Sequence, residues 1–91
     1  MSLKVEMNER VVRITMDRAP LNVLNIRLLR DLDAALTACA ADSAVDVIVI
    51  EGAGQRAFSA GVDIRDHTRE SVPEMLDVVH GVIRKLLAIP Q

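Results

Sequence analysis

Residues 57–65 read Ala-Phe-Ser-Ala-Gly-Val-Asp-Ile-Arg. They lie a few positions beyond an apolar run, Val-Ile-Val-Ile at residues 47–50, that ends in Glu-Gly-Ala-Gly. A buried strand that leads into glycines and other small residues is typical of a site where the backbone approaches a ligand closely. Three kinds of site are compatible with this pattern: a nucleotide phosphate loop, a serine nucleophile elbow, and an oxyanion hole for thioesters.

The residues before this stretch predict a hairpin, a helix and a strand. Residues 3–7 and 11–16 flank an Asn-Glu turn and have the pattern of a hairpin with one buried face. Asn25 is a suitable N-cap, and apolar side chains then recur at helical spacing up to about residue 40 or 41. Residues 45–50 are nearly continuous and β-branched, which predicts a strand buried on both faces. This order favours an α/β arrangement with some parallel pairing.

The residues after this stretch predict a polar segment and a second helix. Ser71 and Glu74 have the spacing of a capping box, and a helical apolar pattern continues from there to about Ala88. The helix should end there because residues before Pro90 resist the helical conformation. Residues 89–91 have the pattern of a lead-in to another element, so we expect residues 1–91 to form the N-terminal fragment of a single domain, with no internal boundary.

Composition limits the possible class of protein. Ninety-one residues make at most one small domain, and with one Phe and no Trp or Tyr its core must be aliphatic. The formal charge of −2 gives no support to a nucleic-acid partner. The N-terminus has no signal-peptide pattern, and no apolar run reaches the roughly 18 residues of a membrane span. We therefore expect a soluble cytoplasmic protein with no membrane partner, in which Cys39 is a small buried residue.

The phosphate-loop interpretation rests on Gly-Ala-Gly-Gln-Arg-Ala at residues 52–57, which formally matches G-x-G-x-x-A after a strand. In a dinucleotide-binding unit the last position lies inside a helix that holds the pyrophosphate. The residues after Gly54 have no amphipathic helical pattern, and Gly61 interrupts them. The sequence therefore disfavours this interpretation.

The nucleophile-elbow interpretation rests on Ser59, because residues 57–61 are one glycine short of G-x-S-x-G. The elbow requires the serine directly at a strand-to-helix turn, whereas Ser59 lies nine residues past Ile50. The two histidines, His67 and His80, also come too soon after the serine for the usual order of serine, acid and histidine. This interpretation is disfavoured as well.

The third interpretation is supported by a family resemblance. Four segments carry it, in this order: residues 11–16, Arg-Ala-Pro-Leu-Asn-Val-Leu-Asn at 18–25, Glu-Gly-Ala-Gly at 51–54 and residues 57–65. With these segments the chain resembles the N-terminal part of the crotonase superfamily, the enoyl-CoA hydratase/isomerase family. In that family Ala-Phe-Ser/Ala-Ala-Gly-x-Asp-Ile/Leu is the signature of the first CoA-binding segment. The resemblance implies the N-terminal portion of the crotonase ββα spiral fold: hairpin, helix, buried strand, CoA loop and helix.

The resemblance also implies a site. It places the CoA thioester on Ala60, Gly61, Val62, Asp63, Ile64 and Arg65, with no metal and no cofactor other than the thioester substrate itself. The Val62 N–H would be a donor of the oxyanion hole, where preorganised donors stabilise the charge of a thioester enolate. Ala60 and Ile64 would line the path of pantetheine and adenine, and Arg65 would meet a CoA phosphate. Asp63 would fix the turn rather than transfer a proton.

One departure and two structural interpretations accompany these roles. Many family members have a basic residue where this chain has Leu21, so the phosphate contact made by that basic residue is not expected here. Asn22 is interpreted as a hydrogen-bonding residue of the loop. The carboxylates Asp66, Glu70 and Glu74 are interpreted as a solvated loop and a helix start.

The family's chemistry requires parts that we expect beyond Gln91, namely a second oxyanion donor in a Gly-rich segment and two glutamates that act as acid and base. The default reaction implied is syn hydration of a 2-enoyl-CoA, with a cyclic dienoyl-CoA as a possible substrate. The 91 residues alone should be inactive, and a complete enzyme should be a trimer or a dimer of trimers. The alternative is a non-catalytic crotonase-like remnant that binds CoA or only a protein partner.

Overall fold

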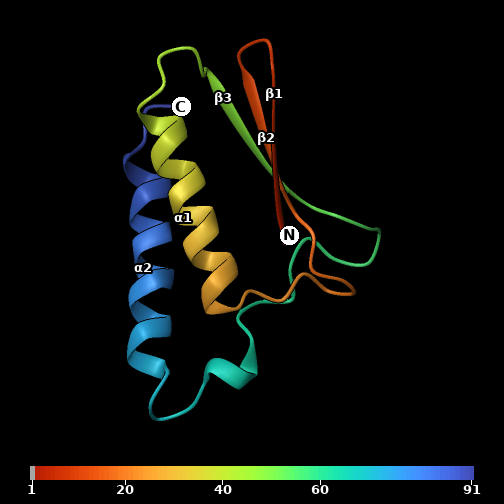
Figure 1. The fold of residues 1–91 in the computed structure, drawn as a ribbon, viewed down its shortest axis with the longest axis vertical. Helices are drawn as coiled ribbons and strands as arrows, with labels where there is room; N and C mark the ends of the chain where they lie inside the picture. The colour runs from red at the N-terminus through yellow and green to blue at the C-terminus, as the bar shows by residue number, and fades with distance from the viewer. Residues whose placement is uncertain (1) are drawn as a thin grey trace.

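The computed structural model describes residues 2–91 and shows a three-stranded sheet with two helices on one side of it (Figure 1). The elements in chain order are β1 (Leu3–Asn8), β2 (Val11–Met16), α1 (Ile26–Ala40), β3 (Val47–Gly52), the 3-10 helix η1 (Ile64–Asp66) and α2 (Val72–Ala88). The sheet order is β1-β2-β3, with β1 antiparallel and β3 parallel to β2. The predicted α/β class and the predicted order of elements are confirmed.

The hairpin forms as predicted, with Glu9 in the turn at a φ of 57°. Alternate residues of β2, namely Val12, Ile14 and Met16, are buried in the core. Of β1 only Leu3 is buried, because this strand lies at the edge of the sheet. The predicted buried face of the hairpin therefore belongs mainly to β2, which lies between the other two strands.

Helix α1 lies between the sheet and α2 and supplies much of the core (Figure 1). Its cap is the predicted one, since Asn25 Oδ1 accepts a hydrogen bond from the Leu28 N–H at 2.8 Å. Its buried side chains are Leu28, Leu29, Leu32, Leu36 and Cys39. Cys39 is buried as predicted, and this burial raises the pKa of its thiol.

The prediction for residues 45–50 is wrong in two respects. The strand begins at Val47 rather than Val45, because Val45 still belongs to a turn in which its N–H donates to the Asp42 carbonyl at 3.1 Å. No residue of β3 is fully buried, and Val47 is 49% exposed. The reason is that β3 pairs only with β2 and forms the other edge of the sheet within the described residues.

Helix α2 begins and ends close to the predicted residues, but its predicted capping box does not form. Ser71 precedes the helix and makes no side-chain cap hydrogen bond, because its backbone is already in the helical region. Glu74 instead forms an ion pair with Arg30 of α1. The helix ends at Ala88, and Ile89 is extended before Pro90, as predicted.

Candidate functional site

The loop after β3 folds back tightly at its start. Gly52 ends the strand, and a Cβ atom added there would lie 2.3 Å from the Phe58 carbonyl oxygen and 2.8 Å from the Phe58 Cα. Backbone atoms cannot give way as the end of a flexible side chain can. Only glycine therefore fits at this position, and the close approach brings residues 57–63 against residues 18–24.

Asn22 holds this loop from the inside. Its side chain is buried, with 1% of the residue exposed, and its φ of 53° is one that asparagine tolerates. Its Nδ2 donates to the carbonyls of Ala53 and Ala57, each at 3.0 Å, and its Oδ1 accepts from the Arg18 N–H at 2.9 Å. The interpretation of Asn22 as a loop-bonding residue is therefore confirmed.

Ser59 has a structural role in the same loop. Its hydroxyl donates to the Asn22 carbonyl at 2.7 Å and accepts from the Gly61 N–H at 3.1 Å. The Nδ1 atom of His67 lies 3.1 Å from the Asp63 carbonyl oxygen rather than at the Ser59 hydroxyl. The hydroxyl proton of Ser59 is thus already engaged by a backbone carbonyl, and within residues 2–91 no histidine or carboxylate accepts it, which argues against the nucleophile-elbow interpretation.

The peptide group between Gly61 and Val62 has a defined orientation. The Leu24 N–H donates to the Gly61 carbonyl at 2.8 Å, and the Asp63 N–H donates to the Leu24 carbonyl at 2.9 Å, which makes an isolated parallel bridge between Leu24 and Val62. In a trans peptide the N–H points opposite to the carbonyl. The Val62 N–H therefore points away from Leu24, and within residues 2–91 it has no hydrogen-bond acceptor.

The Asp63 carboxylate is buried beneath two guanidinium groups. It accepts hydrogen bonds from the Arg65 side chain and the Arg65 backbone N–H, the shortest at 2.7 Å, and from Arg18 at 3.1 Å. The hydrogen bonds from the Arg65 side chain, followed by the one from its backbone, hold the pKa of Asp63 well below its usual range. A carboxylate so strongly held in its ionised form is poorly suited to accept a proton. It does cap η1, because its Oδ1 accepts from the Arg65 N–H.

These residues surround a cavity of about 390 Å³. It is lined by Arg18, Ala19, Pro20, Leu21, Val23, Ala60, Val62, Asp63, Ile64 and Arg65. Five of the six predicted site residues thus come together around it, while Gly61 does not line it and provides the turn at a φ of 104°. Prediction from sequence missed Arg18 as a lining residue, although it begins the motif at residues 18–25.

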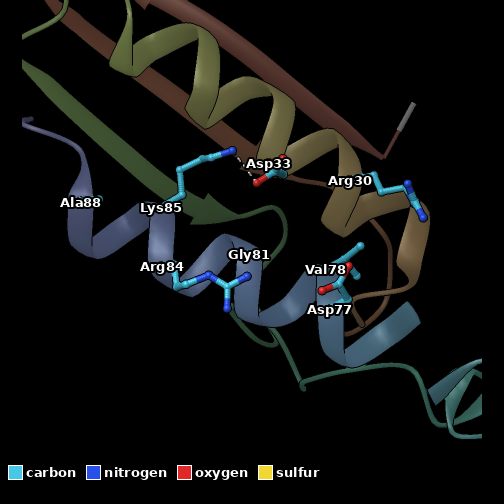
Figure 2. Close-up of a pocket in the computed structure, with 8 residues that line it drawn as sticks. All are labelled: Arg30, Asp33, Asp77, Val78, Gly81, Arg84, Lys85 and Ala88. Carbon is cyan, nitrogen blue, oxygen red and sulfur yellow. Dashed lines mark ion pairs between the residues drawn. The ribbon is translucent and has the colours of Figure 1, made fainter. Parts of the chain in front are cut away.

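A larger cavity of about 690 Å³ lies between α1 and α2, and Figure 2 shows its charged side chains. Lys85 forms an ion pair with Asp33 at 2.9 Å, and Arg30 pairs with Glu74 across the two helices. None of the predicted site residues lines it. We therefore take the smaller cavity as the candidate site, because it has the loop with a free backbone donor.

Two of the three carboxylates interpreted as a solvated loop and a helix start, Asp66 and Glu74, have partners in the structure. The Asp66 Oδ2 accepts from the Ile26 N–H at 3.1 Å, so it satisfies the start of α1 instead of lying free in solvent.

In the part of the chain that the structure describes, no three His, Cys, Asp or Glu side chains gather where they could hold a metal ion. No helix among residues 2–91 is long and apolar enough to cross a membrane. No helix follows Gly54 before η1, so the phosphate-loop interpretation fails.

Comparison with known proteins identifies the family. The family model for enoyl-CoA hydratase/isomerase matches residues 6–89. A probable enoyl-CoA hydratase of Rhizobium meliloti (strain 1021) is 44% identical over 87 residues, which are 94% of this chain and 31% of that protein. The mitochondrial 3-hydroxyisobutyryl-CoA hydrolase of Danio rerio is 42% identical over 53 residues, which are 57% of this chain and 14% of that protein.

Solved structures agree with the sequence comparison. The crystal structure of enoyl-CoA hydratase from Bacillus anthracis matches all of this chain with a TM-score of 0.92 and 26% identity, and the match covers 37% of that chain. The fold is the N-terminal portion of the crotonase α/β fold, and the chain belongs to the enoyl-CoA hydratase/isomerase family. The chain spans between a quarter and a third of the length of the first curated relatives it matches, 31% and 26%.

Proposed function

We propose that this chain is the acyl-CoA-binding part of an enoyl-CoA hydratase/isomerase-type enzyme, and that the Val62 N–H is one donor of its oxyanion hole. The observation that carries the proposal is the free Val62 N–H, whose direction is set by the Gly61 carbonyl bound to Leu24. A donor oriented before the ligand arrives stabilises developing charge without reorganisation at the moment of reaction.

The chemistry that uses such a donor is enolate formation from a thioester. When a nucleophile adds to C3 of a 2-enoyl-CoA, negative charge moves onto the thioester oxygen, and protonation at C2 then completes the addition. We propose syn hydration of a 2-enoyl-CoA as the default reaction, with a cyclic dienoyl-CoA as a possible variant. The relatives support the common part of this proposal, because their names describe a hydratase and a hydrolase of CoA thioesters.

The CoA portion is proposed to occupy the 390 Å³ cavity. Ala60 and Ile64 would line the path of pantetheine and adenine, and Arg65, whose side chain is 76% exposed, would reach a CoA phosphate. Leu21 lines the same cavity and gives it an apolar wall where many family members have a basic residue. CoA enters this proposal as part of the substrate rather than as a cofactor.

The acid and base of the reaction are proposed to come from outside the described residues. The carboxylates around the loop already have partners, with Asp63 between two arginines and Asp66 at the start of α1. For the complete enzyme we propose a cytoplasmic homotrimer or dimer of trimers. Sedimentation of the full-length protein tests that assembly.

The experiment that tests the proposal uses acetoacetyl-CoA, whose enolate absorbs in the ultraviolet. We expect the chain and its Val62→Ala variant to lower the pKa of the bound thioester by about 2, which is what one backbone donor supplies. Val62→Pro removes the N–H and should abolish that change, with circular dichroism used to check that it folds. Equal enolate formation in all three proteins would refute the role of Val62, and CoA binding without any enolate would favour a non-catalytic CoA-binding relative.

A further inference from the structure

Arg18 connects the two segments that meet at the Leu24–Val62 bridge. Its side chain donates one hydrogen bond to the Val23 carbonyl at 2.7 Å and another to the Asp63 carboxylate at 3.1 Å. Val23 and Asp63 are each one position from a residue of the bridge, on opposite segments. The same guanidinium group therefore spans the two segments that set the direction of the Val62 N–H.

The two arginines that share Asp63 differ in their surroundings. The Arg18 side chain is 23% exposed and bonded on both sides, whereas the Arg65 side chain is 76% exposed and, among the described residues, bonded only to Asp63. Both arginines donate to the same buried carboxylate, but only the Arg65 guanidinium lies in solvent, where water replaces a lost partner at little cost. The less exposed Arg18 guanidinium would leave the Val23 carbonyl and the Asp63 carboxylate without their donor, which is costly for buried groups. Arg65 can thus leave Asp63 for an anionic group of a ligand, and Arg18 cannot leave without breaking the connection.

We propose that Arg18 is a positioning residue that retains the Asp63 carboxylate, and with it the orientation of the Gly61–Val62 peptide, when Arg65 turns to a phosphate of the bound CoA thioester. This inference rests on the proposed oxyanion role of Val62. It adds a division of roles between the two arginines. Arg18 keeps the Val62 N–H oriented, and Arg65 exchanges between Asp63 and the ligand.

Lysine cannot replace arginine in this role. The planar guanidinium presents several N–H groups in a fixed fork, which allows Arg18 to bond a carbonyl and a carboxylate at once. A lysine ammonium at the same position keeps the charge, but it has no such fork. The variant Arg18→Lys therefore separates the positive charge from the connection, and Arg18→Gln removes both.

The first measurement is amide hydrogen exchange by NMR on the free chain. The amides of Leu24 and Asp63 form the bridge, and in Arg18→Gln they should exchange about tenfold faster or more, the effect expected from losing a charge-assisted hydrogen bond. The amides in the middle of α1 should keep their protection, which shows that the variant folds. Arg13→Gln is the matched control, because it removes an arginine paired with Glu51 at 3.0 Å on the sheet. Unchanged exchange at Leu24 and Asp63 would overturn the proposal.

The second measurement is the absorption of bound cinnamoyl-CoA, which moves to longer wavelength when its carbonyl oxygen accepts a strong hydrogen bond. At saturating ligand, Arg18→Gln and Arg18→Lys should lose at least about half of the wild-type red shift, while Arg13→Gln keeps it. A full shift in both Arg18 variants would overturn the role of Arg18 and leave Val62 in place. No shift in the wild-type chain would overturn the oxyanion proposal and this inference with it.

Discussion

Leu24 and Val62 form a single parallel bridge in which Leu24 uses both its N–H and its carbonyl, while the Val62 N–H stays free within the described residues. The bridge joins a segment that follows the hairpin to a loop that follows β3. The bridge fixes the peptide group between Gly61 and Val62, so the Val62 N–H is a backbone donor with a set direction. The orientation of the Val62 N–H therefore depends on the residues that keep this bridge in place.

Gly52 is the first of these residues. Gly52→Ala places a Cβ 2.3 Å from the Phe58 carbonyl oxygen, so we expect a loss of about 1–3 kcal/mol in the free energy of unfolding from overpacking. Gly81→Ala is the matched control, because a Cβ there meets nothing within 4 Å. In the interior of α2, alanine should raise the free energy of unfolding by about 0.5–1 kcal/mol relative to glycine. Urea denaturation measures both. If Gly52→Ala were as stable as Gly81→Ala, the close approach of Phe58 would be wrong.

Asn22 is the second residue that keeps the Leu24–Val62 bridge in place. Asn22→Ala leaves the carbonyls of Ala53 and Ala57 without their side-chain donor, and we expect a loss of about 2–4 kcal/mol in the free energy of unfolding. Asn22→Asp has nearly the same volume but turns a donor toward two carbonyls into an acceptor, so it should be at least as destabilising. Asn8→Ala, at the exposed end of β1, is the control and should change stability little. An Asn22→Asp variant with the same free energy of unfolding as the wild type would contradict this role.

The sequence predicted the local features of this fold and missed the ones that depend on distant partners. The Asn25 cap and the end of α2 before Pro90 follow from neighbours along the chain, and both are confirmed. The burial of β3 was wrong because an apolar run does not reveal whether a strand has one neighbour or two. Arg18 was missed because its carboxylate partner lies 45 residues further on, and no local pattern pairs them.

The capping box at Ser71 shows the same limit. Its spacing was correct, but Glu74 has an oppositely charged partner on α1, so its side chain points to Arg30 rather than back to Ser71. In the candidate site, five residues of the motif at 57–65 line the cavity together, and the other five lining residues, from 18–23, were not predicted to meet them there. The direction of the Val62 N–H required the structure, because it is set by Leu24.

Asp63 gives a pH-dependent signature. Hydrogen bonds from Arg65 and Arg18 lower the pKa of Asp63 in the folded state below the value of about 3.9 for an unfolded aspartate. Its contribution to stability is therefore complete above about pH 4 and is lost as the pH falls through the folded pKa. We expect the difference in unfolding free energy between the wild type and Asp63→Asn to be constant from pH 5 to 7, and to shrink below about pH 4.

Chemical denaturation of both proteins at a series of pH values measures this difference. The Asp46→Asn variant is a useful control, because Asp46 is ion-paired with Arg10 at 2.6 Å in an exposed position. Its effect should fall at high salt, whereas that of the buried Asp63 should persist. A difference for Asp63→Asn that grows as the pH falls would contradict the pairing.

The 91 residues by themselves should not hydrate crotonyl-CoA. Of the carboxylates beside the loop, Asp63 is held in its ionised form by two arginines and Asp66 accepts from the Ile26 N–H, so we expect neither to serve as the acid or the base. Loss of the enoyl absorption of crotonyl-CoA with time measures the activity, and a full-length family member serves as the positive control. Turnover by the chain above the rate in buffer would show that one of its own residues performs the proton transfer.

The most direct test of the central claim is the carbonyl stretching frequency of crotonyl-CoA labelled with ¹³C at the thioester carbonyl, measured by infrared difference spectroscopy. With the wild-type chain and with Val62→Ala, we predict a shift to lower frequency on binding, because the Val62 N–H donates to the carbonyl oxygen. With Val62→Pro, which has no N–H to donate, the bound ligand should absorb at the frequency found in buffer. The same lowered frequency in Val62→Pro would contradict the account.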